Sequence, residues 1–276
     1  IKFSINSNTL MAKHIIVIDI VGLERKHISE NLTPNIFNIS QTGETRNIET
    51  VFPAVTCTVQ SSLLSGSYPE IHGIISNGLY NRQNYAVSFW EQSSNLVQAD
   101  RIWDTLKMRG TGSKTAVLFW QNTMYSNADI VLTPRPLHMD DRIIMWCYSK
   151  PPGFYEKLYQ KLGKFDLSWY WGPLASKKSS EWIELATEFV LENEMPNFLF
   201  TYFPHLDYAF QRNGTSYNNI KDDLKFIDDL VGRLVTKATN IGIIGDTQFI
   251  IFSEYGFTDV NSDISLNTIF RENELI

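Results

Sequence analysis

The sequence lacks the features that mark several large functional classes. Its net charge of -6 and pI near 5.4 argue against the basic face of a nucleic-acid-binding module. Apolar runs, such as residues 15–21 with Asp19 inside, are much shorter than a membrane-spanning helix. Residues 1–10 are polar and contain no apolar signal-peptide core. We therefore expect no nucleic-acid partner and no membrane partner.

Cysteine is also scarce, and several catalytic motifs are missing. The two cysteines, Cys57 and Cys147, form no metal-binding or disulfide pattern, so we expect a reducing, cytoplasmic environment. The chain has no phosphate-binding loop ending in Gly-Lys, no dinucleotide-binding fingerprint and no recognisable Ser-His-Asp arrangement. Nucleotide-dependent motors, dinucleotide-dependent oxidoreductases and serine hydrolases are therefore poor models for its function.

What the chain does have is an alternation of strand and helix patterns. We expect strands at residues 15–20, 46–50, 115–120, 197–203 and 247–253, and helices opening at Thr33-Pro34 and Thr56 and over residues 100–110, 179–193 and 219–239. Such alternation predicts an α/β three-layer sandwich around a mostly parallel sheet. A hydrophobic content of 43% supports one domain over residues 11–276.

The two ends of the chain carry their own expectations. Met11 reads as a natural start, so residues 1–10 are expected to form a tail. Residues 271–276 read as part of a helix with no stop signal. We therefore expect the C-terminal part of the fold to be missing.

The most informative segment is FPAVTCTVQSSLLSGSYPEIHGI at residues 52–74, followed by Asn77. It places hydroxyl groups, led by Thr56, at the start of a short helix that follows an extended run. The free N–H groups and positive dipole end of a helix favour phosphate-like anions. A threonine hydroxyl is inert there unless a metal or a base takes its proton. The segment therefore indicates a nucleophile that needs an activator.

Three acidic residues follow the ends of predicted strands. Asp19, Asp207 and Glu254 should lie at the carboxyl edge of the sheet, where ligands bind in α/β folds. Like charges held together are costly unless a cation neutralises them, so a divalent metal is the simplest explanation. The alternative is that one or two of them only cap helices. His205, beside Asp207, is either a metal ligand or a hydrogen-bonded structural residue.

The other conspicuous residues have structural interpretations. We expect His72 to be structural, His14 to stand at the far end of the first strand, and His27 and His138 to be exposed. Cys57 should be a buried small residue in the first helical turn.

Two groups of side chains have a structural interpretation as well as a functional one. The pair at residues 228–229 could be read as a carboxylate pair for acid–base work, but solvation or a salt bridge is the better interpretation. The aromatic segment at residues 165–171 could wall a substrate pocket, although core packing is the preferred interpretation.

Together these segments resemble the alkaline phosphatase superfamily. The similarity is greatest to its nucleotide pyrophosphatase/phosphodiesterase branch, which also includes phosphonoacetate hydrolase. It rests on the strand with Asp19, the Thr56 segment, Asn77 and the segments at residues 205–208 and 253–256. Residues 89–92 and 133–136 also resemble segments of uncharacterised bacterial members of this family.

The resemblance implies a two-step in-line displacement on a phosphoester. Thr56 would be the nucleophile, activated by a metal ion and forming a covalent phosphothreonine that water then hydrolyses. Asn77 would hold a non-bridging phosphoryl oxygen, for roughly 3 kcal/mol of transition-state stabilisation. Asp19 and Asp207 would bind metal. The substrate would be a small phosphorylated molecule.

The chain departs from the family pattern at its histidines. Gln211 stands four residues after Asp207 where the family has histidine, Glu254-Tyr255 replaces an Asp-His pair, and no histidine follows Tyr255. A di-zinc centre of the usual composition therefore cannot be assembled. The remaining candidate metal ligands are oxygen-rich and suit Mg²⁺, Mn²⁺ or Ca²⁺ better than Zn²⁺; they are Asp19, Thr56, Asp207, Glu254, His205 and Gln211.

These observations support a metal-dependent hydrolase of phosphodiester or phosphoanhydride substrates as the leading hypothesis. The lost histidines motivate a second hypothesis, a pseudoenzyme that binds a phosphorylated ligand without chemistry. Hydrolysis of phosphonates or sulfate esters at the same site is a third.

Overall fold

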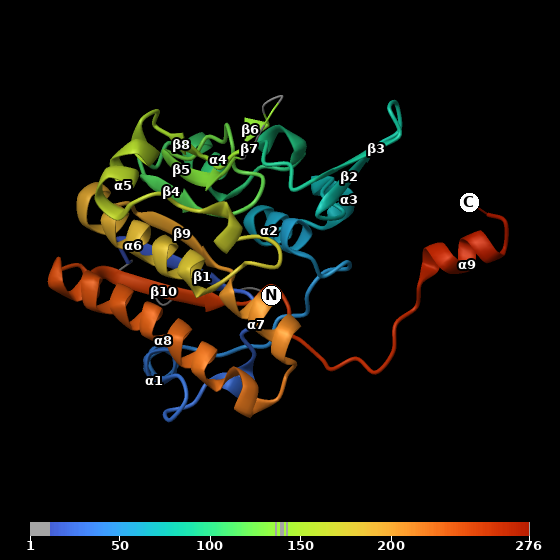
Figure 1. Ribbon diagram of the computed structural model, residues 1–276. Helices are drawn as coiled ribbons and strands as arrows, with labels where there is room; N and C mark the ends of the chain where they lie inside the picture. The colour runs from blue at the N-terminus through green and yellow to red at the C-terminus, as the bar shows by residue number, and fades with distance from the viewer. Residues whose placement is uncertain (1–11, 136, 139–140, 142, 276) are drawn as a thin grey trace.

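The computed structural model describes residues 12–135, 137–138, 141 and 143–275 (Figure 1). The predicted tail at residues 1–10 and the start at Met11 lie outside the described residues.

A six-stranded sheet forms the centre of the molecule. Its strand order is β10-β1-β9-β4-β5-β8, and only β8, at one edge, runs antiparallel to its neighbour. The strands are β1 (His14–Ile20), β4 (Thr115–Leu118), β5 (Ile130–Pro134), β8 (Cys147–Lys150), β9 (Phe198–Phe203) and β10 (Thr247–Phe252). Because β1, β4 and β9 lie inside the sheet and carry apolar side chains on both faces, they are almost fully buried. The predicted mostly parallel α/β fold is confirmed.

Helices cover both faces of this sheet. The helices are α1 (Pro34–Gln41), α2 (Thr56–Ser65), α3 (Pro69–His72), α4 (Ile102–Met108), α5 (Phe154–Leu162), α6 (Lys177–Glu194), α7 (His205–Asn213), α8 (Tyr217–Asn240) and α9 (Leu266–Glu272). On one face, Thr187 of α6 hydrogen-bonds Thr201 of β9, with their hydroxyl oxygens 2.8 Å apart. On the other, Trp103 of α4 packs edge-on against Phe200 of β9. The alternation of side chains along β9 therefore serves two helical layers.

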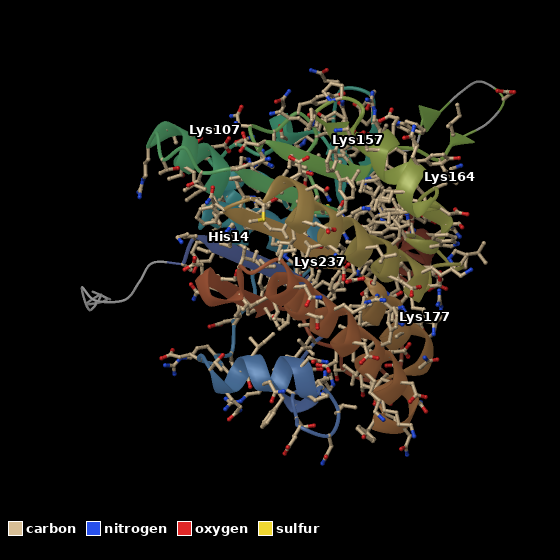
Figure 2. The ribbon with its side chains drawn as sticks, turned by 90° about the vertical axis from the view of Figure 1, so that its left-hand side faces the viewer. His14, Lys107, Lys157, Lys164, Lys177 and Lys237 are labelled. Carbon is tan, nitrogen blue, oxygen red and sulfur yellow. The ribbon has the colours of Figure 1, made fainter. Side chains whose placement is uncertain are left out.

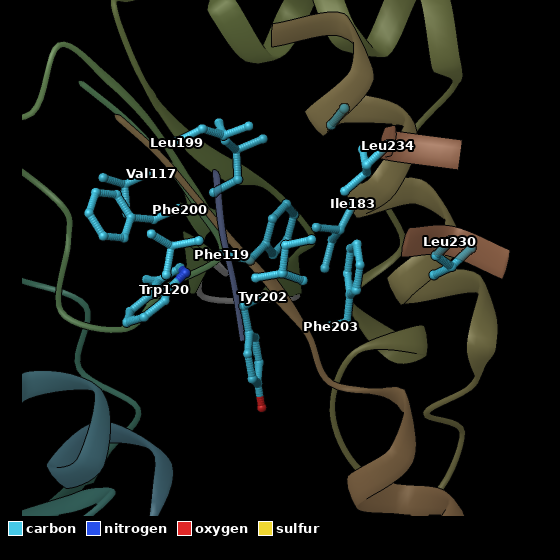
Figure 3. Packing of buried hydrophobic residues seen from close by; sticks show 14 of the residues in the cluster. Val117, Phe119, Trp120, Ile183, Leu199, Phe200, Tyr202, Phe203, Leu230 and Leu234 are labelled. Atoms are coloured by element: carbon cyan, nitrogen blue, oxygen red, sulfur yellow. The ribbon is translucent and has the colours of Figure 1, made fainter. Parts of the chain in front are cut away.

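Figure 3 shows the same division in the core. Val117, Trp120 and Phe200 gather on one side of the central strands, while Ile183 and Leu230 project from the helices on the other. All five side chains are buried.

Two small antiparallel hairpins and an extended C-terminal segment complete the fold. The hairpins are β2 (Gly78–Asn81) with β3 (Ala86–Phe89), and β6 (Leu137–His138) with β7 (Ile143–Ile144). Figure 1 shows α9 standing away from the body at the end of the extended segment. The helix predicted at the C-terminus is present, but it ends at Glu272. Within the described part of the chain, every helix is too short or too polar to cross a lipid bilayer.

Positively charged side chains are distributed over the helical layers rather than along one element. Figure 2 shows Lys107 on α4, Lys157 on α5, Lys177 on α6 and Lys237 on α8 as separate labelled positions. His14 stands at the start of β1, where its Nδ1 lies 2.8 Å from the carbonyl oxygen of Pro196. It therefore lies at the opposite end of that strand from Asp19, as predicted.

Two of the sequence predictions about local structure are wrong. No strand forms at residues 46–50, which are exposed and irregular. These residues pair with none of the strands of the sheet, whose edge strands are β10 and β8. His27 is buried rather than exposed, because its ring stacks on Phe210 with centroids 5.5 Å apart. The His138 side chain, also predicted to be exposed, lies outside the described residues.

The side chain of Thr33, the residue before α1, does not cap this helix. The Thr33 hydroxyl donates to the carbonyl oxygen of His27 and makes no capping bond. The N-terminus of α1 is instead capped from α8. Asp228 Oδ1 accepts from the N–H of Ile36 at 2.8 Å, and Oδ2 accepts from the N–H of Asn35 at 3.0 Å. Asp228 is therefore a buried cap that fixes α1 to α8, not a solvated carboxylate.

Other interpretations are confirmed. Cys57 is buried in the first turn of α2, and both cysteines are unpaired. Phe165 and Tyr170 are core residues and do not line an open pocket. His72 is buried and structural, because its Nε2 pairs with the Ser62 hydroxyl at 2.8 Å and its Nδ1 accepts from the N–H of Ile74.

Candidate active site

The candidate site begins with two buried carboxylates at neighbouring strand ends. Asp19 is the penultimate residue of β1, and Glu254 lies two residues beyond the end of β10. β1 and β10 pair in parallel, with Asp19 opposite Phe252. Both carboxylates therefore lie at the carboxyl-terminal edge of the sheet. Their exposed fractions are 0% and 1%. This is the convergence expected from the sequence for these two residues.

Gln60 of α2 joins the two carboxylates. Its Nε2 donates to Asp19 Oδ2 at 3.0 Å and to Glu254 Oε1 at 2.7 Å. Its Oε1 accepts from the N–H of Gln121, just after β4, at 2.7 Å. Every polar atom of the Gln60 amide is therefore used, and three strand ends are tied to one helix. Sequence reasoning missed Gln60, although it lies one helical turn after Thr56 on the same helix face.

Burial sets the electrostatics of this pair. Desolvation, followed by repulsion from Glu254, raises the pKa of Asp19 well above its usual range. Desolvation also raises the pKa of Glu254 to about 7, while the nearby side chains of Asp19, Thr56 and Gln60 oppose that rise. Asp19 Oδ1 and Glu254 Oε2 are buried and have no hydrogen-bond partner among the described residues. The pair therefore retains two oxygens for which the described residues supply no donor.

Thr56 lies at the first position of α2 and is 4% exposed. Its Oγ1 lies 3.5 Å from the hydroxyl oxygen of Tyr255. The Tyr255 hydroxyl in turn donates to Asp207 Oδ1 at 3.2 Å. Asp207 is therefore linked to the Thr56 hydroxyl through Tyr255. A group of three His, Cys, Asp or Glu residues able to hold a metal is not found in the portion of the chain that the structure describes.

Both oxygens of Asp207 are engaged. Besides the Tyr255 hydroxyl at Oδ1, the Gln211 amide donates to Oδ2 at 2.9 Å from one turn later on α7. Desolvation raises the pKa of Asp207, and these two hydrogen bonds oppose the rise. Gln211 thus contacts Asp207 as the sequence spacing suggested, but as a donor. Desolvation, with the charges of Glu254 and Asp207, also raises the pKa of Tyr255.

Asn77 is fixed against the first turn of α2. Its Oδ1 accepts from the N–H of Cys57 at 2.9 Å. Because the amide oxygen is occupied in this way, the amide NH₂ is the group available to a ligand. Cys57 directly follows Thr56, so a donor is tethered one residue from the hydroxyl.

His205 faces a different neighbour from the one expected of a ligand. Its Nε2 lies 2.7 Å from Asp223 Oδ1 on α8, and its ring packs edge-on against Phe226. Its Nδ1 is buried without a partner among the described residues. The structure therefore places His205 at the α7–α8 contact, whereas Asp19, Glu254, Thr56 and Asp207 lie in one network.

A separate hollow of about 230 Å³ lies beside α2, lined in part by Val51, Val59, Leu63 and Tyr68. None of the candidate catalytic or metal-binding residues lines it. The chemistry suggested by the buried network therefore belongs to a different side of the helix.

Comparison with known proteins decides the family. Residues 15–276 match the model of the type I phosphodiesterase/nucleotide pyrophosphatase family. The chain belongs to this family. The match covers nearly the whole chain, and it confirms the resemblance to the nucleotide pyrophosphatase branch of the alkaline phosphatase superfamily.

Curated family members are distant in sequence. An uncharacterised pyrophosphatase/phosphodiesterase of Schizosaccharomyces pombe is 22% identical over 281 residues, which is 96% of this chain and 50% of the relative. The human bis(5'-adenosyl)-triphosphatase is 22% identical over 270 residues, covering 96% of this chain and 52% of the relative. The chain thus spans about half the length of these relatives.

Solved family structures share the fold. Phosphonoacetate hydrolase from Sinorhizobium meliloti, in complex with phosphonoacetate, has a TM-score of 0.63 at 17% identity, covering 96% of this chain and 63% of that one. An inactive form of murine ectonucleotide pyrophosphatase/phosphodiesterase 5, in complex with AMP, has a TM-score of 0.58 at 15% identity, covering 88% and 57%. The predicted alkaline phosphatase-like architecture is confirmed by these neighbours.

Proposed function

We propose that this chain hydrolyses phosphodiester or phosphoanhydride bonds, with Thr56 as the nucleophile. The observation that carries the proposal is the pairing of Thr56 with Asn77, whose amide is anchored to the N–H of the adjacent residue, Cys57. The Asn77 amide is thereby anchored one residue from Thr56, at the start of α2. Membership of the family supports the reaction class.

We propose one role for each group. Thr56 Oγ1 attacks phosphorus, the bond to the leaving oxygen breaks on the opposite side, and a phosphothreonine forms. The Asn77 NH₂ donates to a non-bridging oxygen, where negative charge grows in the transition state. Water then cleaves the phosphothreonine and restores the Thr56 hydroxyl. Tyr255 contacts Thr56 Oγ1 and fixes its orientation.

The family also implies a divalent cation, and part of this site fits one. Asp19 Oδ1 and Glu254 Oε2 are buried carboxylate oxygens without a donor among the described residues, and Thr56 Oγ1 is the neighbouring hydroxyl. These three oxygens would hold the ion. When bound, it would lower the pKa of the Thr56 hydroxyl and offset the charge of the two carboxylates. An all-oxygen set favours Mg²⁺ or Mn²⁺ over Zn²⁺.

The substrate is proposed to be a small phosphorylated molecule. A structural neighbour binds AMP and a curated relative is named for cleavage of a dinucleoside triphosphate, which supports a nucleotide-like substrate. The cytoplasmic location stays a prediction.

Activity assays with a matched pair of variants test the proposal. The full chain is assayed on bis-p-nitrophenyl phosphate and on diadenosine triphosphate with Mg²⁺, Mn²⁺ and Zn²⁺ in turn. Thr56→Val removes the hydroxyl while conserving shape, and we expect turnover to fall by at least about 10³-fold. Thr58→Val is the control, because Thr58 is buried two residues later in α2 and its hydroxyl has no hydrogen-bond partner in the described structure. Equal activity of the two variants would refute the assignment of Thr56.

A further inference from the structure

We propose that this site binds one divalent cation rather than two, and that Tyr255 and Gln211 occupy the place of a second. The inference rests on the proposed function of the site and concerns only the number of cations. It follows from a difference between the two halves of the network. In the first half, Asp19 and Glu254 each have one buried oxygen without a donor among the described residues, and in the second half both oxygens of Asp207 accept hydrogen bonds from neutral donors.

The first half has the charge and the free atoms that a cation needs. Asp19 and Glu254 bring two carboxyl groups to a site from which water is excluded. Gln60 holds one oxygen of each, so the remaining oxygens, Asp19 Oδ1 and Glu254 Oε2, are left without partners. Two carboxylates balance one divalent charge. Gln60 thereby acts as a positioning residue, because it decides which oxygen of each carboxylate is free.

The second half is already satisfied without a cation. Asp207 Oδ1 accepts from the Tyr255 hydroxyl, and Oδ2 accepts from the Gln211 amide. Both donors are neutral and come from different elements, α7 and the segment after β10. Asp207 differs from the first pair in that each of its oxygens already accepts a hydrogen bond and no second carboxylate among the described residues shares these donors. A single carboxylate that is already hydrogen-bonded to neutral groups attracts a cation less strongly than a pair of carboxylates with unpartnered oxygens.

His205 does not supply a ligand for a second cation at Asp207. His205 Nε2 is paired with Asp223, and its ring is packed on Phe226 of the same helix. Turning the ring toward Asp207 would break a 2.7 Å contact and leave the Asp223 carboxylate without it. The described residues accordingly supply Asp207 with no nitrogen ligand from this helix pair.

Titration of the full chain with Mn²⁺ tests the stoichiometry without using activity. Isothermal titration calorimetry counts the ions, and electron paramagnetic resonance distinguishes an isolated Mn²⁺ from a spin-coupled pair. We expect one ion per chain and an uncoupled six-line spectrum. Two ions, or a coupled spectrum, would overturn the inference while leaving the hydrolase proposal intact. No bound ion at millimolar Mn²⁺ would also overturn it. The hydrolase proposal is judged separately by the Thr56→Val assay.

A matched pair of carboxylate variants locates the ion. Glu254→Gln removes a proposed ligand oxygen, and we expect Mn²⁺ affinity to fall at least about tenfold. Asp207→Asn changes a carboxylate of the same network that is not a proposed ligand. We expect its Mn²⁺ affinity to be within about threefold of that of the unchanged chain. Thermal unfolding without metal shows that each variant is folded. Equal losses of affinity in the two variants would contradict the inference.

A gain-of-site variant tests whether Tyr255 and Gln211 exclude a second ion at Asp207. Gln211→His combined with Tyr255→His removes both neutral donors and adds two imidazoles beside Asp207. We expect this double variant to bind a second Mn²⁺, shown by a calorimetric stoichiometry of two. A folded double variant that still binds one ion would show that Tyr255 and Gln211 do not determine the stoichiometry, and would overturn that part of the inference.

Discussion

Replacing Gln60 by leucine should strongly destabilise the protein, because this amide is the structural link of the site. The side chain is fully buried, and its Nε2 donates to two carboxylates while its Oε1 accepts a backbone N–H. Hydrogen bonds to charged groups contribute about 1.5–3 kcal/mol each, and an orphaned buried N–H costs about 1–3 kcal/mol. Leucine conserves the volume but none of these bonds. We expect a loss of about 4 kcal/mol.

Urea or thermal unfolding of the metal-free protein measures this loss. A loss of that size corresponds to a decrease in Tm of about 10 °C for a domain of this length. The matched control is Gln41→Leu, an identical change at an exposed position in α1, which should alter stability by less than about 0.5 kcal/mol.

The loss of stability in Gln60→Leu should also depend on pH. Gln60 lowers the pKa of both Asp19 and Glu254, so it stabilises their ionised forms. The loss should therefore be greater at pH 8 than at pH 5. A Gln60→Leu protein within about 1 kcal/mol of the unchanged chain would refute the reasoning.

Three further outcomes are expected. Asp228→Ala should lower stability by about 2 kcal/mol in denaturant unfolding because it uncaps α1, whereas exposed Asp229→Ala should change little. Burial raises the folded-state pKa of Glu184 to about 8 from a usual 4.5, so its contribution to stability is fully present below pH 4.5 and is lost as pH rises toward 8. The difference in unfolding free energy between the unchanged chain and Glu184→Gln should therefore fall as pH rises from 4.5 to 8, although Arg233, 2.9 Å from Glu184 Oε2, opposes the effect; a flat difference would contradict the prediction. Asn77→Asp keeps an acceptor for Cys57 but loses the donor and adds negative charge, so turnover of bis-p-nitrophenyl phosphate should drop about 10²–10³-fold with unchanged folding.

Much of the fold was predictable because its signals are local. The strand with Asp19 is a β-branched apolar run, and α8 repeats its apolar residues with helical spacing. Parallel strands place their ends together, so the meeting of Asp19 with Glu254 also follows from the sequence. The irregular path of residues 46–50 did not follow, because a strand forms only where it pairs with another strand, and the local sequence pattern does not show that pairing.

The parts that were missed depend on contacts between distant residues. Gln60 lies inside a helix, and nothing in the local pattern shows that its amide meets two strand ends. Asp228 reads as part of a polar helix face, yet the residue it caps is 192 positions away. His205 stood beside Asp207 in sequence, but the turn of α7 directs its ring to α8. Side-chain direction in each case is set by the tertiary packing.

The composition of α2 shows how stability and function are balanced in this site. Its buried positions include Thr56, Thr58, Gln60 and Ser61, so much of the buried part of this helix consists of hydroxyl and amide groups. Burying such groups costs free energy unless hydrogen bonds replace water, and the Thr58 hydroxyl has no partner in the described structure. A helix selected for packing alone would carry leucine or valine at these positions. Gln60 differs from Thr58, because its amide hydrogen-bonds to two carboxylates and to the N–H of Gln121. Thr58→Val should accordingly be at least as stable as the unchanged chain, whereas Gln60→Leu should be far less stable, because only Gln60 exchanges its burial for bonds to the carboxylates.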